Sequence, residues 1–179
     1  MNQPPVIIVD YDPTWPQQYE AEKALIEQAI RPHITRIAHA GSTSVPSLSA
    51  KPIIDILIGL RSLDDARSCI EPLERLGYQY VPEHEGNVPD RRYFRKPHGT
   101  DGGTHHVHMV VEGTDGWIKP LLFRDFLRAH PESARAYDSL KRRLADQYQT
   151  DRVGYTKAKT EFILETEALA QAWHEQQKV

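Results

Sequence analysis

Residues 39–57, HAGSTSVPSLSAKPIIDIL, join a polar turn to the start of a strongly apolar segment. Residues 52–60 are almost continuously apolar, which is typical of a central strand that is covered on both faces. Asp55 is the one charged residue that interrupts this run after its first positions. A carboxylate in such a strand costs several kcal/mol unless it is paired or bound to a metal. We therefore predict a functional role for Asp55, with a structural ion pair to Lys51 or an arginine as the alternative.

The turn that precedes this strand contains Gly41, Ser42 and Thr43. A Gly-Ser turn that leaves a strand frees backbone N–H groups and adds hydroxyl groups, and phosphate oxygens require such donors. A carboxylate on the next strand can hold the Mg²⁺ that neutralises those phosphates. Lys51 would add a positive charge. The alternative is a polar turn beside a solvated lysine, because short Gly-Ser motifs are weak signals.

A histidine pair forms the second constellation, in the predicted strand at residues 104–111. Alternate residues of a strand share one face, so His106 and His108 point the same way while His105 points the other way. Two imidazoles at this spacing can chelate a divalent ion or bind a phosphate. A partly exposed strand with a ladder of histidines is the alternative explanation.

Cations outside these two segments are candidates for contacts with an anionic ligand: Arg92, Arg124 and Lys159. Arg92 lies in a basic strand at residues 91–95, where a solvated edge is the usual explanation. Arg124 shares a helical face with Arg128 because the two are one turn apart. Lys159 follows Tyr155 by four residues on another predicted helix. We expect these helices to close the site, with surface ion pairs as the competing interpretation.

The remaining patterns predict an α+β (or α/β) fold, with a mixed sheet in the first two-thirds and helices after it. A capping box at Thr14 and Gln17 predicts the start of the first helix, and Ser62 caps the second. We expect one domain over residues 1–179, with the sheet region at about 6–111 and C-terminal helices at about 116–176. The predicted strands are residues 6–9, 35–40, 52–60, 78–81, 91–95 and 104–111, and three helices follow from 117, from 131 and around 155–173.

Composition narrows the classes of function. The chain has 179 residues and a formal net charge of −3. It has no excess of basic residues, so its composition does not indicate a nucleic-acid partner. Cys69 is the single cysteine, which excludes an intrachain disulfide. The sequence contains no stretch of 18 apolar residues, so we predict no membrane span. The apolar residues 6–9 are too few for the core of a signal peptide. We expect a cytoplasmic protein.

These segments together resemble the GrpB-like family. The resemblance runs from about residue 9 to residue 163 and is most specific in the segment from the Gly-Ser turn to Ile-Asp-Ile. One departure is Ser47, where the family has a glycine-like position. The residues that carry the resemblance are Tyr11-Asp12-Pro13, Trp15-Pro16, residues 39–46, Leu48, residues 50–57, Leu76-Gly77-Tyr78, Arg92-Tyr93-Phe94, His106-Val107-His108, residues 123–128, Tyr137, Lys141, Tyr155 and Lys159.

The resemblance implies a nucleotidyltransferase fold like that of DNA polymerase beta and its relatives. Those enzymes show Gly-Ser or Gly-Gly, a spacer, and then two carboxylates that flank one apolar residue. Here Ser42 is followed by Asp55, but the second carboxylate position is Leu57. A two-metal mechanism needs several carboxylates. Either His106 and His108 supply the missing ligands, or catalysis has been lost.

The leading prediction is transfer of a nucleotidyl group from a nucleoside triphosphate to a small molecule or protein. In this scheme Asp55, His106 and His108 hold Mg²⁺ or Mn²⁺, with Zn²⁺ as the other option, or one histidine acts as general base. The predicted phosphate-binding residues are Gly41, Ser42, Thr43, Lys51, Arg92, Arg124 and Lys159. The alternatives are a nucleotide- or phosphometabolite-binding protein without turnover, and a metal-dependent phosphohydrolase.

Overall fold

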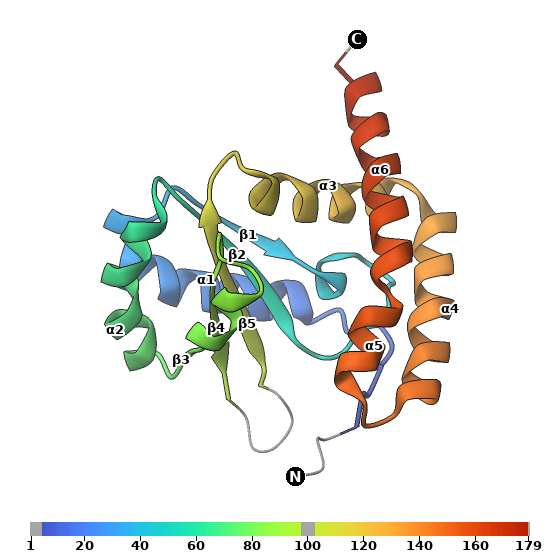
Figure 1. Ribbon diagram of the computed structural model, residues 1–179, viewed down its shortest axis with the longest axis horizontal. Helices are drawn as coiled ribbons and strands as arrows, with labels where there is room; N and C mark the ends of the chain where they lie inside the picture. The colour runs from blue at the N-terminus through green and yellow to red at the C-terminus, as the bar shows by residue number, and fades with distance from the viewer. Residues whose placement is uncertain (1–4, 98–102, 179) are drawn as a thin grey trace.

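The computed structural model describes residues 5–97 and 103–178, and five strands in these ranges form one mixed sheet (Figure 1). The order is β1-β2-β5-β4-β3, with β2 and β5 parallel and the other pairs antiparallel. Strand β2 therefore has hydrogen-bonded neighbours on both sides, as the apolar run predicts. The strands are β1 (Arg36–Ala40), β2 (Ile54–Leu60), β3 (Gln79–Tyr80), β4 (Arg92–Lys96) and β5 (His105–Val111).

Two helices cover one face of the sheet. Helix α1 (Trp15–Ile30) and helix α2 (Arg67–Arg75) pack their apolar residues against Ile54, Ile56 and Ile58 of β2. Each of these isoleucines is at most 1% exposed, and burial of such a side chain stabilises the fold by about 2 kcal/mol. Helix α2 follows a short 3₁₀ turn that Ser62 caps, with Asp65 completing a capping box. Because side chains alternate along β2, Asp55 and Leu57 lie on the opposite face of the sheet from these isoleucines.

The C-terminal helices lie on that opposite face and beside the loop after β1 (Figure 1). Trp117 packs on Leu57, while other residues from α3, α4 and α6 enclose Val45 and Leu48 of the loop. The loop is thus held between the sheet and the helices. The helices are α3 (Asp115–Ala129), α4 (Pro131–Tyr148), α5 (Arg152–Ala158) and α6 (Thr160–Gln176). Among the described helices, none combines the length and the apolar character that a bilayer crossing requires.

The predicted fold class is confirmed: an α+β arrangement with a mixed sheet, flanking helices and a C-terminal helical segment. The predicted last helix is two helices, α5 and α6, which meet at Lys159. The predicted turn at residues 98–103 lies mostly outside the described residues.

Two local predictions near the N-terminus are wrong. The segment at residues 6–9 is not a strand, because within it only Val9 bridges to Ala50, and Val6 is buried beside Leu144. The capping box at Thr14 is absent, since the Thr14 side chain accepts no capping hydrogen bond. Instead Asp12 Oδ1 accepts from Thr14 N at 2.8 Å, so the Asp12 side chain stabilises the turn before α1.

Candidate metal and phosphate site

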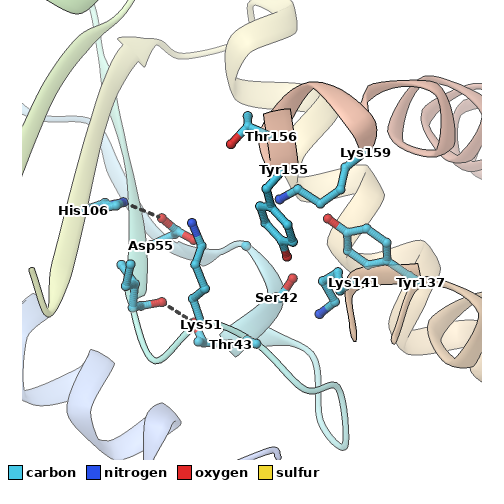
Figure 2. Close-up of a pocket in the computed structure, with 13 residues that line it drawn as sticks. Ser42, Thr43, Lys51, Asp55, His106, Tyr137, Lys141, Tyr155, Thr156 and Lys159 are labelled. Carbon is cyan, nitrogen blue, oxygen red and sulfur yellow. Dashed lines mark hydrogen bonds and ion pairs between the residues drawn. The ribbon is translucent and has the colours of Figure 1, made fainter. Parts of the chain in front are cut away.

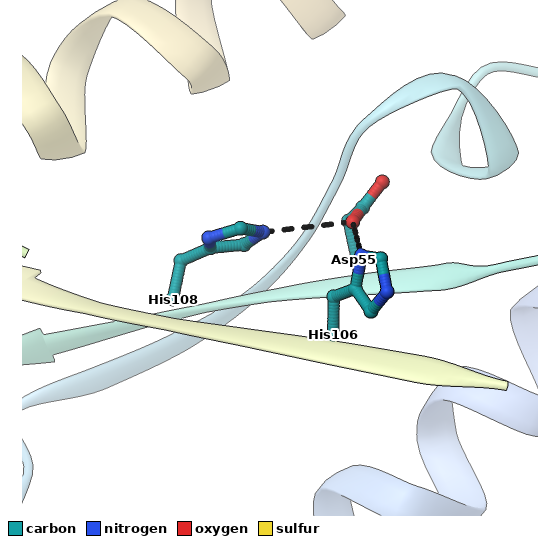
Figure 3. Close-up of side chains that lie close together, drawn as sticks. All are labelled: Asp55, His106 and His108. Carbon is teal, nitrogen blue, oxygen red and sulfur yellow. Dashed lines mark ion pairs between the residues drawn. The ribbon is translucent and has the colours of Figure 1, made fainter. Parts of the chain in front are cut away.

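The parallel pairing of β2 with β5 brings the predicted carboxylate and the two histidines together. Asp55 stands opposite His106 in the register, and Leu57 stands opposite His108. Asp55 Oδ1 lies 3.5 Å from His106 Nδ1 and 3.6 Å from His108 Nε2 (Figure 3). The three side chains that the sequence assigns to one metal site are therefore close together. Asp55 has no ion pair with Lys51 or an arginine among the described residues, so the predicted structural alternative is not observed.

The donor set suits a divalent ion. One ligand atom from each of Asp55, His106 and His108 lies within 4.8 Å of the others. Two ligands that each bind an ion at about 2.1 Å are separated by roughly 3–3.5 Å at tetrahedral or octahedral angles. The carboxylate–imidazole distances are close to that range. Because two of the three donors are nitrogens, the set suits Mn²⁺ or Zn²⁺ better than Mg²⁺.

The local electrostatics keep Asp55 and His108 in the protonation states that a metal requires. Burial alone would raise the pKa of Asp55, but the interactions with His106 and His108 outweigh it and hold the pKa below its usual range. Burial lowers the pKa of His108, and the nearby Asp55 offsets only part of that effect. The carboxylate is therefore ionised and the His108 imidazole neutral near neutral pH, as metal ligands must be.

The second oxygen of Asp55 faces the Gly-Ser turn. Gly41 has φ 68° and ψ −175°, in a region that favours glycine. A Cβ at Gly41 would lie 2.9 Å from Asp55 Cγ and closer still to Asp55 Oδ2. The turn and the carboxylate are thus in direct contact, and only a glycine permits that contact.

A cavity of about 270 Å³ opens in front of this turn (Figure 2). Its walls come from the turn, from β2 and β5, and from helices α4 and α5. Asp55 and His106 line it, whereas His108 lies behind them and is not part of the lining. The other polar residues that line the cavity are Ser42, Thr43, Lys51, Tyr137, Lys141, Tyr155, Thr156 and Lys159.

Three lysines make this cavity electropositive. The Nζ atoms of Lys51 and Lys159 lie 5.6 and 4.4 Å from the centroid of the Tyr155 ring. Lys141 Nζ lies 4.8 Å from the Tyr137 ring centroid and donates to the carbonyl of Ser49. Within the described residues, none of the three lysines forms an ion pair with a carboxylate. These lysines could therefore pair with an anion in the cavity.

Burial disfavours the charged form of all three lysines. It lowers the pKa of Lys141 to about 7 and that of Lys159 to about 8, and it lowers the pKa of Lys51. The charge of Lys51 lowers the pKa of Lys159 further. A bound anion would raise the pKa values of these lysines and so offset the effects of burial and of this repulsion.

The Thr43 hydroxyl is already hydrogen-bonded within the protein. Its hydroxyl donates to Ile53 O at 3.2 Å and lies 3.0 Å from His39 Nε2. Because the hydroxyl proton goes to Ile53, His39 Nε2 must donate to Thr43, which fixes the neutral tautomer. Burial lowers the pKa of His39 to about 4, so this imidazole is neutral. Thr43 can serve the cavity through its backbone only.

Two predicted phosphate contacts lie away from the cavity. Arg92 pairs with Glu85 at 3.3 Å and donates to Pro89 O at 2.8 Å. Arg124 pairs with Asp125 at 2.7 Å and donates to His39 O at 2.9 Å. Neither lines the cavity. The Arg92 charge is balanced by Glu85, and the Arg124 charge is balanced within α3.

Sequence reasoning assigned no role in the site to Tyr137 or Lys141, although both line the cavity. Tyr137, Leu144 and Lys141 follow one face of α4, and Lys141 is only 2% exposed. A lysine on the apolar face of a helix is unusual. That pattern in the sequence could have identified Lys141 as a candidate site residue.

The fold and site define an α+β protein with a candidate Asp-His-His metal centre beside an electropositive cavity. The chain belongs to the GrpB protein family, whose model matches residues 5–168. The UPF0157 protein YqkA of Bacillus subtilis is 40% identical over 168 residues, which cover 94% of this chain. The chain spans 48% of the length of that relative.

One solved structure agrees with the family assignment. The crystal structure of the conserved protein GrpB from Enterococcus faecalis superposes with a TM-score of 0.84 at 34% identity, covering 94% of this chain and 99% of that one. Terminal uridylyl transferase 4 from Trypanosoma brucei aligns with a TM-score of 0.47 at 13% identity, over 73% of this chain and 41% of that one. The second likeness is too low to carry an argument about function.

Proposed function

We propose that this chain binds a nucleoside triphosphate in the cavity and transfers its nucleotidyl group to an acceptor, with a divalent ion at Asp55, His106 and His108. One observation carries the proposal. One oxygen of Asp55 faces the two histidines while the other faces Gly41 of the turn. A metal ligand and a phosphate-binding turn are therefore adjacent, which is the arrangement that phosphoryl and nucleotidyl transfer needs.

The turn has donors to offer a phosphate. Among the described residues, the backbone N–H groups of Ser42 and Thr43 donate to no carbonyl, while those of Ser44 and Val45 close the 3₁₀ turn. Consecutive free N–H groups form a concave anion site. Ser42 also lines the cavity, and its hydroxyl is a further polar group there (Figure 2).

The lysines offset the remaining charge of the phosphates. Lys51 and Lys159 stand on either flank of Tyr155, and Lys141 lies beside Tyr137, so cations surround the cavity rather than occupy one wall. A divalent ion, when bound, would neutralise phosphate charge and polarise the phosphorus centre. Asp55 would orient that ion toward the turn. Catalysis in this scheme is mainly positioning and electrostatic stabilisation.

A nucleotide- or phosphometabolite-binding protein without turnover is the second candidate, and Leu57 favours it. Leu57 is 2% exposed and packs with Ala40, Val110 and Trp117, so it cannot contribute a ligand. The second carboxylate of the resemblance is therefore missing from β2. His108, which stands opposite Leu57, occupies the nearest place on the same face of the sheet.

Turnover separates these candidates and the phosphohydrolase alternative. The protein is incubated with ATP and Mn²⁺ or Mg²⁺, with and without a mixture of small-molecule acceptors and carrier protein. The proposal expects release of pyrophosphate that depends on the acceptor and is lost in Asp55→Asn. Release of inorganic phosphate without an acceptor would indicate a phosphohydrolase. Saturable ATP binding without release of either product would contradict transfer and support the binding protein.

A further inference from the structure

Helix α3 directs two arginines at the backbone of the phosphate-binding turn. Arg124 Nη1 donates to His39 O at 2.9 Å, at the end of β1. Arg128 donates to Ser44 O through Nε at 3.0 Å and through Nη2 at 2.6 Å. The two arginines are one helical turn apart. They therefore hold the two ends of residues 39–44, the segment that contains Gly41, Ser42 and Thr43.

Asp125 keeps both guanidinium groups in place. Its carboxylate accepts from Arg124 Nε at 2.7 Å and from Arg124 Nη2 at 3.0 Å, and Arg128 Nη1 lies 3.6 Å from the same carboxylate. The Arg124 side chain is 16% exposed. These charges are already used by Asp125 and by two carbonyl groups. Neither arginine lines the cavity, so neither contacts a ligand there.

The turn benefits from such support because its glycine is conformationally free. Gly41 is at φ 68° and ψ −175°, a conformation that glycine adopts readily but that no side chain of its own fixes. The free N–H groups of Ser42 and Thr43 would bind a phosphate well only if their directions are fixed before the ligand arrives. Hydrogen bonds from charged groups to the carbonyls at both ends are stronger than neutral ones.

We propose that Arg124 and Arg128 are positioning residues that preorganise the turn at residues 39–44 for an anion, without touching that anion. This inference rests on the proposed function, because it takes this turn to be the anion-binding wall. It replaces the prediction from sequence that Arg124 itself contacts phosphate.

Calorimetric titration with inorganic triphosphate and Mg²⁺ tests the proposal in the full chain, over a series of NaCl concentrations. Variants Arg124→Met and Arg128→Met should bind about ten- to a hundred-fold more weakly, as expected for loss of a charge-assisted hydrogen bond. The slope of log affinity against log salt should stay at the wild-type value, because no cation–phosphate contact is lost. Lys159→Met, in the cavity wall, should lower both affinity and slope.

Two controls address charge and folding. Arg75→Met removes an arginine that pairs with Glu71 within α2, and it should leave the affinity unchanged. Arg128→Lys keeps the charge and one donor, and it should retain more affinity than Arg128→Met. Wild-type affinity in both methionine variants would overturn the proposal. A salt slope reduced as in Lys159→Met would overturn it too, because it would show direct contact.

Amide hydrogen exchange keeps the inference testable apart from the proposed function. In Arg128→Met, the amides of Ser44 and Val45, which close the turn, should exchange faster, while those of α1 should not change. Unchanged exchange at Ser44 and Val45 would overturn the positioning role. If wild-type protein binds no triphosphate yet exchange rises as expected, the proposed function fails while the arginines are shown to hold the turn.

Discussion

The Asp55 carboxylate packs directly on the backbone of Gly41, so that no side chain fits between the candidate metal centre and the Gly-Ser turn. Gly41→Ala would push a methyl group into the carboxylate and would strain a backbone at φ 68°. We expect a loss of about 1–3 kcal/mol in the free energy of unfolding, from urea denaturation. We also expect weaker binding of Mn²⁺, because Asp55 must move. Gly86→Ala, where an added Cβ meets nothing within 4 Å, is the matched control. Equal Mn²⁺ affinity in wild type and Gly41→Ala would contradict this contact.

Asp55→Asn preserves shape and removes the charge of the carboxylate. In the wild-type protein, Mn²⁺ or Zn²⁺ at a hundred times its Kd should raise the free energy of unfolding by about 2.7 kcal/mol. The variant should lose this stabilisation in thermal unfolding scans while remaining folded without metal. Asp115→Asn, which removes a carboxylate from a surface ion pair with Lys119, should keep it. Equal stabilisation of Asp55→Asn and wild type would exclude Asp55 as a ligand.

The buried Lys141 predicts two opposite trends with pH. Its pKa is lowered to about 7 by burial, whereas the unfolded chain keeps the proton up to about 10.5. Between these values the unfolded state binds more protons, so the contribution of Lys141 to the free energy of unfolding rises with pH. Triphosphate affinity should fall over the lower part of this range, as Lys141 and then Lys159, with a pKa of about 8, lose their charge.

Urea denaturation and calorimetric titration at a series of pH values from neutral upward measure these two trends. Lys141→Met should flatten the rise in stability above pH 7 and the first part of the fall in affinity. Lys157→Met, an exposed lysine of α5, should leave both profiles unchanged. Affinity that does not vary with pH in wild type would show that neither lysine neutralises the anion.

The hydrogen bond between His39 and Thr43 should couple the two side chains energetically. His39→Met and Thr43→Val each remove one partner, and the double variant removes both. Thr43→Val leaves His39 Nε2 without its partner, whereas in His39→Met the Thr43 hydroxyl still donates to Ile53 O, so we expect a coupling of about 1 kcal/mol in a double-mutant cycle. Urea denaturation of the four proteins measures it. Strictly additive losses would show that the two groups are stabilised separately.

The sequence alone was sufficient for the central strand of the fold and for the shared face of His106 and His108. A strand that is apolar at every position but one must be covered on both faces, and that is how β2 is buried. The alternation of β5 likewise places His106 and His108 on one face. These predictions succeeded because they depend on the period of a strand, which is a local property.

The roles of the arginines could not be predicted in the same way. Arg124 and Arg128 share a helical face, but the pattern does not say whether that face meets a ligand or a backbone carbonyl. The answer depends on how α3 packs beside the end of β1, which is a tertiary property. Lys141 differs, because its place on the apolar face of α4 was visible and was overlooked. The loss of the second carboxylate at Leu57 was also visible, but only the structure shows His108 opposite it.

Crystals soaked with Mn²⁺ and a non-hydrolysable ATP analogue test the central claim most directly. The account predicts an anomalous Mn²⁺ peak at about 2.0–2.3 Å from ligand atoms of Asp55, His106 and His108. It also predicts phosphate oxygens within hydrogen-bond distance of the Ser42 and Thr43 N–H groups, with Lys51 and Lys159 beside them. A nucleotide bound away from residues 41–43, or no Mn²⁺ at the three side chains while the nucleotide is bound, would contradict it.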